Sequence, residues 1–175
     1  MPSKQDNIQR GVLRDGQPLN HENSVRAIVS RIDLTAQTEH LPSRVDIDNA
    51  GMPSAAAYDP YGIYVFTALE ASREVAILDA WSHQEITRFP AGRAPQGVVT
   101  SPDGSTLAFT SARAGKPQLH LISVGAPGGE ARALTTIANG AHSPAWSPDG
   151  KRIAFLSGSS AEERGACRHA CGSGD

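Results

Sequence analysis

The sequence has few aromatic residues, only two cysteines and no long apolar run. Aromatic residues make up 5% of the 175 positions. No stretch approaches the ~20 consecutive apolar residues that a membrane-spanning helix needs, and the N-terminus lacks the apolar core of a signal peptide. Two cysteines cannot supply a disulfide framework. We therefore expect a chain that neither spans a membrane nor is visibly exported.

The charges are few and balanced. Sixteen Lys and Arg residues against eighteen Asp and Glu residues give a net charge of −2, and neither sign forms a run. This disfavours nucleic acid and anionic membranes as partners. With 39% hydrophobic residues, a chain of this length is expected to form one domain with its own core.

A tetrapeptide recurs along the chain. Ser-Pro-Asp-Gly occupies residues 101–104 and again 147–150, and the related Asp-Pro-Tyr-Gly occupies 59–62. The spacings are 42 and 46 residues, and an apolar run follows each copy. Pro presets the first corner of a turn, Asp tolerates the second, and Gly takes the left-handed position. Each copy is therefore predicted to form a hairpin turn.

A second pattern repeats in another phase, because Ile32-Asp33 with Glu39 matches Leu78-Asp79 with Glu85, again 46 residues apart. Periods of ~40–45 residues with several short strands are typical of a β-propeller blade of four antiparallel strands. The sequence therefore predicts an all-β fold, a partial β-propeller of about three blade-equivalents.

The expected organisation is two complete units between two half-units. A flexible arm (1–24) precedes the half-unit 25–50, and a disordered tail (159–175) follows the half-unit 141–158. The complete units are 54–92 and 94–138. Their expected strands are 54–57, 63–67, 74–79 and 85–89, then 97–100, 106–111, 118–124 and 131–137. The half-units supply the third and fourth strands (27–34, 39–47) and the first and second strands (143–146, 152–156).

The half-units leave closure open, because a closed propeller usually needs at least ~4 blades. The chain could remain an open arc or curl into a tight ring of three blades. Two copies could instead complete each other's split blades, which gives a homodimer of six blades about a twofold axis. A truncated product without stable function is a further interpretation, since half-units expose sheet edges.

Two stretches resemble known propeller repeats. Residues 25–104, through 63–67, 75–79 and 94–104, resemble the YVTN-type repeats of bacterial surface and envelope proteins. Residues 105–158, through 128–135 and 144–155, resemble TolB-type (WD40-like) repeats, which also occur in the propellers of prolyl-oligopeptidase-like serine peptidases. The resemblance implies a scaffold that displays loops to partners, and a bacterial periplasm or envelope location, although no signal peptide is visible.

Five residues are candidates for a binding surface on predicted loops. Tyr61, Asp103 and Asp149 lie in the tetrapeptide turns, and Trp81 and His83 lie in the hairpin 80–84, which we expect on the opposite face. The plainer interpretation of the hairpin is a turn residue beside a packed tryptophan. One carboxylate per turn falls short of the six to eight oxygens that Ca²⁺ takes, so turn stabilisation is expected of both aspartates.

Motifs for catalysis or cofactor binding are missing. The segment 158–162 lacks the second glycine of a Gly-x-Ser-x-Gly nucleophile elbow. Cys167 and Cys171 are separated by three residues with no following His, so they are no haem attachment motif, and the tail offers too few ligands for zinc. We expect no cofactor and no metal.

The predicted function is a non-catalytic binding or scaffold module for a protein or small ligand, as a fragment of a larger bacterial propeller protein. The alternative is the gating propeller of a prolyl-oligopeptidase-like serine peptidase, without its hydrolase domain.

Overall fold

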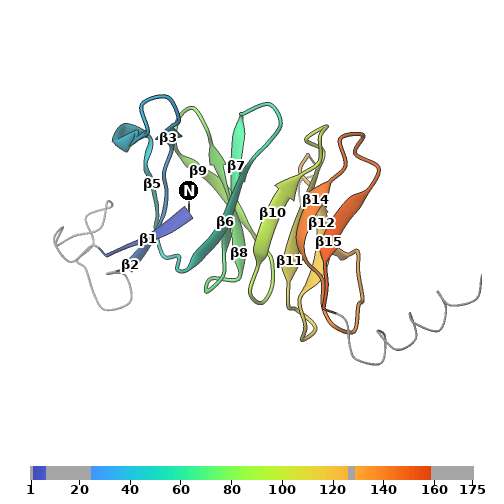
Figure 1. Cartoon of the computed structure of the whole chain (residues 1–175). Helices are drawn as coiled ribbons and strands as arrows, with labels where there is room; N and C mark the ends of the chain where they lie inside the picture. The colour runs from blue at the N-terminus through green and yellow to red at the C-terminus, as the bar shows by residue number, and fades with distance from the viewer. Residues whose placement is uncertain (1, 7–24, 126–128, 159–175) are drawn as a thin grey trace, which may run out of the picture.

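The computed structural model describes residues 2–6, 25–125 and 129–158. Short antiparallel strands form nearly all of its regular structure. The sheets stand side by side in a row, with the N-terminal strands at one end and β14–β15 at the other (Figure 1). The predicted all-β class is confirmed. Within the described ranges, no helix is long and apolar enough to cross a membrane.

Two four-stranded sheets form the centre of the row. Counted from the N-terminal end of the row, they are the second and third sheets. The second sheet contains β6 (Pro53–Tyr58), β7 (Tyr64–Leu69), β8 (Glu74–Asp79) and β9 (Glu85–Pro90). The third sheet contains β10 (Gln96–Thr100), β11 (Thr106–Ser111), β12 (Gln118–Ser123) and β13 (Arg132–Ala133). In each sheet the strands lie in sequence order. This is the meander that the repeat predicts for a blade.

The fourth strand of the third sheet is shorter than the expected 131–137, because a side chain replaces part of its ladder. The Gln118 Oε1 atom accepts hydrogen bonds from Thr135 Oγ1 (2.7 Å) and the Ile137 N–H (3.0 Å). The Gln118 Nε2 group donates to the Ile137 carbonyl oxygen (2.7 Å). The segment after Ala133 is thus held beside β12 without forming a strand.

The first sheet departs most from expectation. It contains β1 (Pro2–Asp6), β2 (Val25–Val29) and β5 (Val45–Ile47), in the order β1-β2-β5. A separate hairpin contains β3 (Ile32–Asp33) and β4 (Thr38–Glu39), and the 3-10 helix η1 (Leu41–Ser43) follows it. The expected arm therefore includes a strand at 2–6. Residues 7–24 and the tail 159–175 lie outside the described residues.

Pro42 explains the broken fourth strand of the first sheet. It lies in η1, where its fixed φ suits a tight turn and its missing N–H cannot join a ladder. The turn absorbs two extra residues: Val29 lies opposite Val45, whereas its repeat equivalent Val75 lies opposite Phe89. The expected strand 39–47 is thus divided between β4 and β5.

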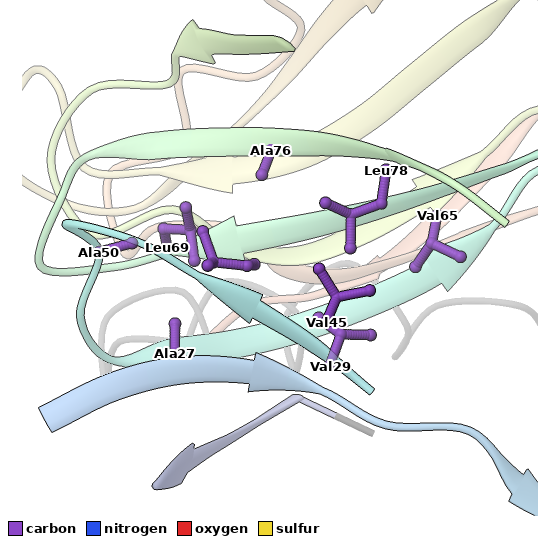
Figure 2. Close-up of a cluster of buried hydrophobic side chains, with 9 residues drawn as sticks. Ala27, Val29, Val45, Ala50, Val65, Leu69, Ala76 and Leu78 are labelled. Atoms are coloured by element: carbon purple, nitrogen blue, oxygen red, sulfur yellow. The ribbon is translucent and has the colours of Figure 1, made fainter. Parts of the chain in front are cut away.

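Two apolar cores lie between neighbouring sheets. Alternate residues of a strand face opposite sides of its sheet, so β7 contributes to both cores. Val65 and Leu69 face the first sheet (Figure 2), and Phe66 and Ala68 face the third. Full burial of such a large side chain stabilises the fold by roughly 1.5–3 kcal/mol. Both cores are therefore built from contacts between sheets.

The row of sheets is an open arc. The fourth sheet contains β14 (His142–Trp146) and β15 (Ile153–Leu156). Within the described part of the chain, β15 pairs with β14 alone. The first and fourth sheets lie at opposite ends of the arc (Figure 1), so the three-blade ring does not form.

Candidate functional site

The turns that carry the candidate residues lie at one end of the sheets. Tyr64, after the first turn of the second sheet, pairs with Asp79, before the next hairpin. The Ala80 N–H donates to the Ile63 carbonyl oxygen (2.8 Å). We call this end the turn face; it comprises the turns 59–62, 101–104 and 147–150 and the hairpins 33–38 and 79–84.

The predicted position of Trp81 and His83 on the opposite face is therefore wrong. In an antiparallel meander the chain leaves the first turn along the second strand, reverses once, and returns along the third strand to the next hairpin. The two connections consequently lie at the same end of the sheet, so Trp81 and His83 are on the same face as Tyr61.

Each Ser-Pro-Asp-Gly turn is closed by the same hydrogen bonds. The Ser101 hydroxyl donates to Asp103 Oδ1 and accepts from the Thr106 N–H (3.0 Å). In the later copy, the Ser147 hydroxyl donates to Asp149 Oδ1 and accepts from the Arg152 N–H (3.0 Å). The serine thus links the aspartate to the second strand.

The carboxylates of these turns serve the turns themselves. Asp103 also accepts from the N–H (3.1 Å) and hydroxyl (2.9 Å) of Ser105. The hydrogen bond from the Ser101 hydroxyl is the main cause that lowers the pKa of Asp103, and Ser147 does the same for Asp149. Both side chains are expected to be ionised at neutral pH, and turn stabilisation accounts for them.

The earliest turn uses an aspartate in place of the serine. Asp59 is buried, and its Oδ1 atom accepts from the N–H groups of Ile63 and Tyr64, both at 2.7 Å. The Asp59 carboxylate replaces the serine hydroxyl as the hydrogen-bond acceptor of this turn. The third turn position therefore does not need an aspartate and is occupied by Tyr61. The Tyr61 hydroxyl donates to the Asp103 carbonyl oxygen (3.3 Å). Two of the predicted residues are thereby brought together.

Tyr61 also explains why glycine is needed in the neighbouring turn. Gly104 has φ +70°, and a Cβ atom there would lie 3.0 Å from Tyr61 Cε2. The tyrosine ring of one sheet thus lies against the turn of the next sheet, and the turn face is continuous across that boundary.

The hairpins 33–38 and 79–84 share one geometry. Asp79 Oδ1 accepts from the N–H groups of Trp81 (2.9 Å) and Ser82 (2.7 Å). Asp33 Oδ1 accepts in the same way from the residues two and three positions later. The pKa of Asp79 is lowered chiefly by the hydrogen bond from the Ser82 N–H. His83 has φ +58°, so it is a turn residue, as the plainer interpretation holds.

Exposed apolar side chains gather on the turn face. Trp81 is 80% exposed and Tyr61 69% exposed, so the expected packing of Trp81 does not occur. Three further exposed apolar residues were not predicted: Leu34 on this face, and Tyr58 and Ile63, which flank its turn 59–62. By the 46-residue repeat, Leu34 after Asp33 corresponds to Ala80 after Asp79. The repeat therefore predicts that Leu34 lies in a hairpin on the turn face. Toward the opposite end of the sheets, the exposed large apolar side chains among the described residues include Met52 and Leu156.

The spaces between neighbouring sheets differ in size. Between the first and second sheets lies a cavity of about 30 Å³ beside Tyr58, Asp79 and His83. Between the second and third sheets lies a groove of about 930 Å³. Its walls include Phe66, Ile77, Phe89, Leu107 and Ile122. The groove was not predicted; residues of the loop before β13, among them Gly125 and Ala131, also line it. In the described ranges, no group of three or more His, Cys, Asp or Glu residues is placed so that it could hold a metal ion.

Comparison with known proteins supports the fold. No protein-family model matches the chain. A stretch of 54 residues, 30% of the chain, is 56% identical to the uncharacterized peptidase YuxL of Bacillus subtilis and covers 8% of that protein. The TolB structure from Acinetobacter baumannii matches with a TM-score of 0.62 at 22% identity, over 78% of this chain and 35% of that one. The hydrazine synthase of Kuenenia stuttgartiensis gives 0.62 at 23% identity, over 82% and 40%.

These likenesses confirm the resemblance to propeller repeats. The chain spans less than half the length of each of these proteins. Its four-stranded antiparallel sheets form about three blade-equivalents of a β-propeller.

Proposed function

We propose that the chain is a non-catalytic binding module, part of a larger bacterial propeller protein, that recognises a protein partner through the turn face. The observation that carries this proposal is the exposure of Tyr58, Tyr61, Ile63 and Trp81 at the same end of the second sheet. Exposed apolar residues are common singly, but a cluster of them marks an interaction site. Tyrosine and tryptophan are also the side chains that most often dominate binding energy at interfaces.

The shape of the turn face favours a protein over a small molecule. Its cavity of about 30 Å³ is close to the volume of one water molecule. Small-molecule sites occupy roughly 300–1,000 Å³, so a small ligand would instead fit the groove between the second and third sheets. A second copy of the chain is a third candidate partner. The phases of the strands favour its binding at a surface other than the turn face.

Selection of peptides from a displayed library on the purified chain tests the turn face without a known partner. We expect the selected peptides to lose about 30-fold in affinity for Trp81→Ala or Tyr61→Ala, which corresponds to about 2 kcal/mol. Ile86→Ala is the matched control, because Ile86 is an exposed apolar residue outside this face. Peptides that bind all three variants equally would contradict the proposal.

A second candidate function rests on the identity to the peptidase YuxL. Under this second candidate function, the chain is the non-catalytic, substrate-gating propeller of a prolyl-oligopeptidase-like serine peptidase. Sequencing the DNA that flanks the coding region tests this candidate. A downstream segment with a Gly-x-Ser-x-Gly elbow between a strand and a helix would support it. Flanking segments that contain propeller repeats and no elbow would contradict it.

A further inference from the structure

Strand β15 has the apolar pattern of a buried strand but lacks its burial. By the repeat of the Ser-Pro-Asp-Gly turn, Phe155 is equivalent to Phe109, and Leu156 is equivalent to Thr110. Phe109 and Thr110 are at most 1% exposed, whereas Phe155 is 38% and Leu156 59% exposed. The sequence of β15 thus suits an environment that the single chain does not provide.

In the complete sheets, the third strand covers the second strand. Val65 of β7 lies opposite Leu78 of β8, and the equivalent Leu107 of β11 lies opposite Ile122 of β12. No third strand lies beside β15 within the described residues. A strand in this place would need the register of β8 or β12.

The first sheet contains a third strand in the matching phase. Asp33 and Asp79 form the same hairpin, so Ile32 takes the place of Leu78 and Val29 the place of Val75. Strands β2 and β3 together therefore correspond to β8. Strand β1 pairs with β2 from Val25 to Val29 and does not reach Ile32.

We propose that β15 of one copy pairs antiparallel with β2 and β3 of a second copy. Two such contacts about a twofold axis close a ring of six blades. In the register of the complete sheets, Ile153 lies opposite Ile32 of the second copy, and Leu156 lies opposite Val29. In this register Leu156 and Pro2 of β1 would occupy the same edge at Val29, so the proposed pairing requires the first residues of β1 to leave β2.

The charges of the two edges are complementary in this register. Arg152, whose side chain is 80% exposed and lies 3.6 Å from the Asp149 carboxylate, comes to lie opposite Asp33 of the second copy. Backbone N–H groups, chiefly that of Ala36, donate hydrogen bonds that lower the pKa of Asp33. Its carboxylate is therefore ionised at neutral pH. Opposite charges on facing strands stabilise a pair, and like charges destabilise it.

Light scattering after size exclusion tests the proposal on the full chain. We expect a mass of twice 18.4 kDa for the wild type and a shift to the single-chain mass for Leu156→Asp. Ile86→Asp is the control and should keep the double mass. Circular dichroism of each peak establishes that the variant is folded. A wild type of single-chain mass, or one that forms open-ended oligomers, overturns the proposal.

A cysteine pair tests the register even if Leu156→Asp fails to fold. Ile32→Cys with Ile153→Cys, in a background of Cys167→Ser and Cys171→Ser, should form a covalent dimer under mild oxidation. The two positions lie at opposite ends of one arc, so the crosslink must join two copies. Ile86→Cys with Ile153→Cys should remain uncrosslinked. Equal crosslinking of both pairs, or none of the first pair, overturns the register. Neither experiment involves the turn-face residues, so its outcome is independent of the proposed function.

Discussion

The boundary between the first and second sheets is closed, whereas the boundary between the second and third sheets opens into a groove. We call these the first and second seams. Their cavities measure about 30 and 930 Å³. Their inner walls are equivalent, since Val65 and Leu78 of the first seam correspond to Leu107 and Ile122 of the second. The difference must therefore arise at the outer strands.

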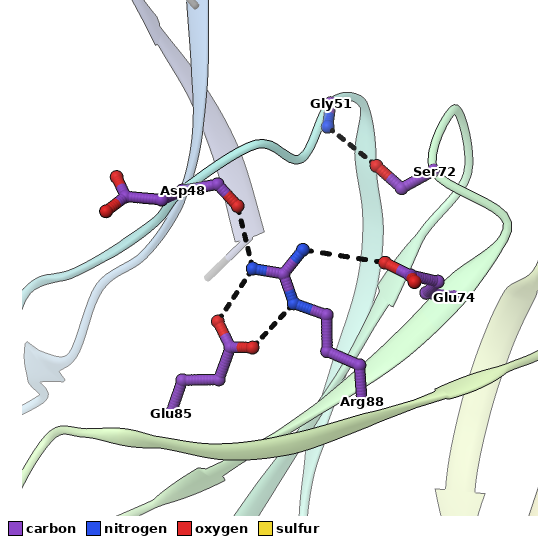
Figure 3. A network of polar contacts seen from close by, with 6 residues as sticks. All are labelled: Asp48, Gly51, Ser72, Glu74, Glu85 and Arg88. Atoms are coloured by element: carbon purple, nitrogen blue, oxygen red, sulfur yellow. Dashed lines mark hydrogen bonds and ion pairs between the residues drawn. The ribbon is translucent and has the colours of Figure 1, made fainter. Parts of the chain in front are cut away.

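An arginine crosses the first seam. The Arg88 Nη2 group on β9 donates to the Asp48 carbonyl oxygen (2.7 Å), and its guanidinium is also held by Glu85 and Glu74 (Figure 3). Arg88 lies opposite Ala76, and in the third sheet Ala133 lies opposite the equivalent residue, His120. Ala133 has no side chain that could reach across the second seam, so the same backbone leaves a groove there.

Truncation of a leucine in each seam should give the largest difference. We expect Leu78→Ala to lower the free energy of unfolding by about 4 kcal/mol, because it leaves an enclosed cavity in the closed seam. Leu107→Ala should cost about 2.5 kcal/mol, because Leu107 lines the groove and the space that it leaves would join the groove instead of forming an enclosed cavity. Both side chains are at most 1% exposed, so burial is matched. Urea unfolding followed by circular dichroism measures both; equal losses would contradict the comparison.

Removal of the crossing arginine should open the first seam. Arg88→Ala leaves Glu85 and the Asp48 carbonyl oxygen without the donor. We expect a loss of about 1.5–3 kcal/mol, the usual range for hydrogen bonds to charged groups. Arg113 is the matched control, because it donates to the Ala91 and Pro90 carbonyl oxygens at the second seam but is exposed. Arg113→Ala should cost about 1 kcal/mol. If Arg113→Ala cost more than Arg88→Ala in thermal and urea unfolding, the assigned role of Arg88 would be wrong.

A segment connects the two sheets at each seam, and each segment contains a glycine: Gly51 at the first seam and Gly92 at the second. The two glycines differ in their surroundings. Gly92 has φ +80°, and a Cβ atom there would collide with Arg113 Cγ. We expect Gly92→Ala to cost about 2 kcal/mol through backbone strain and displacement of the arginine. In the link of the first seam, a Cβ atom on Gly51 would make an ordinary contact of 3.5 Å with Ala71, so Gly51→Ala should be nearly neutral.

Melting temperatures of the two alanine variants provide the measurement. The double variant Gly92→Ala with Arg113→Ala separates the two causes, because it removes the collision and keeps the positive φ. If the double variant is as stable as Arg113→Ala alone, backbone strain contributes nothing.

The sequence predicts the turns well because their chemistry is local. Proline, aspartate and glycine at fixed offsets specify a turn wherever they occur, so the strands next to 59–62, 101–104 and 147–150 lie close to their expected positions. The common face of Tyr61 and Trp81 was also available from the sequence, since it follows from the number of chain reversals alone.

The seams and β1 could not be predicted in the same way. The counterpart of Arg88 is identified only by the register of β12 and β13, and a loop of unequal length precedes β13. Strand β1 has the sequence Pro-Ser-Lys-Gln-Asp, which has no alternation of apolar residues. Its pairing with β2 depends on an open edge elsewhere in the chain, and a local pattern carries no information about that edge.

The smallest expected difference between the seams is a pH dependence. His120 lies in the second seam, where its equivalent in the first seam is Ala76. Its ring stacks on Phe109, with centroids 5.6 Å apart, and its Nδ1 atom lies 3.0 Å from the Gln118 carbonyl oxygen. Burial lowers the pKa of His120 from its ordinary value of 6.5, and the charge of Arg113 lowers it further. The unfolded chain therefore binds the proton more tightly than the folded chain.

The sign of the effect follows from this order of affinities. The stability that neutral His120 contributes is complete above pH 6.5 and is lost as the pH falls from 6.5 through the lowered pKa of the folded state. Urea unfolding at pH 7.5 and at pH 5.5 should show a loss in the wild type that is smaller in His120→Gln. Carboxylates such as Asp103, with lowered pKa values, lose their contribution only at more acidic pH. An equal loss in both proteins would assign the pH dependence to a group outside the second seam.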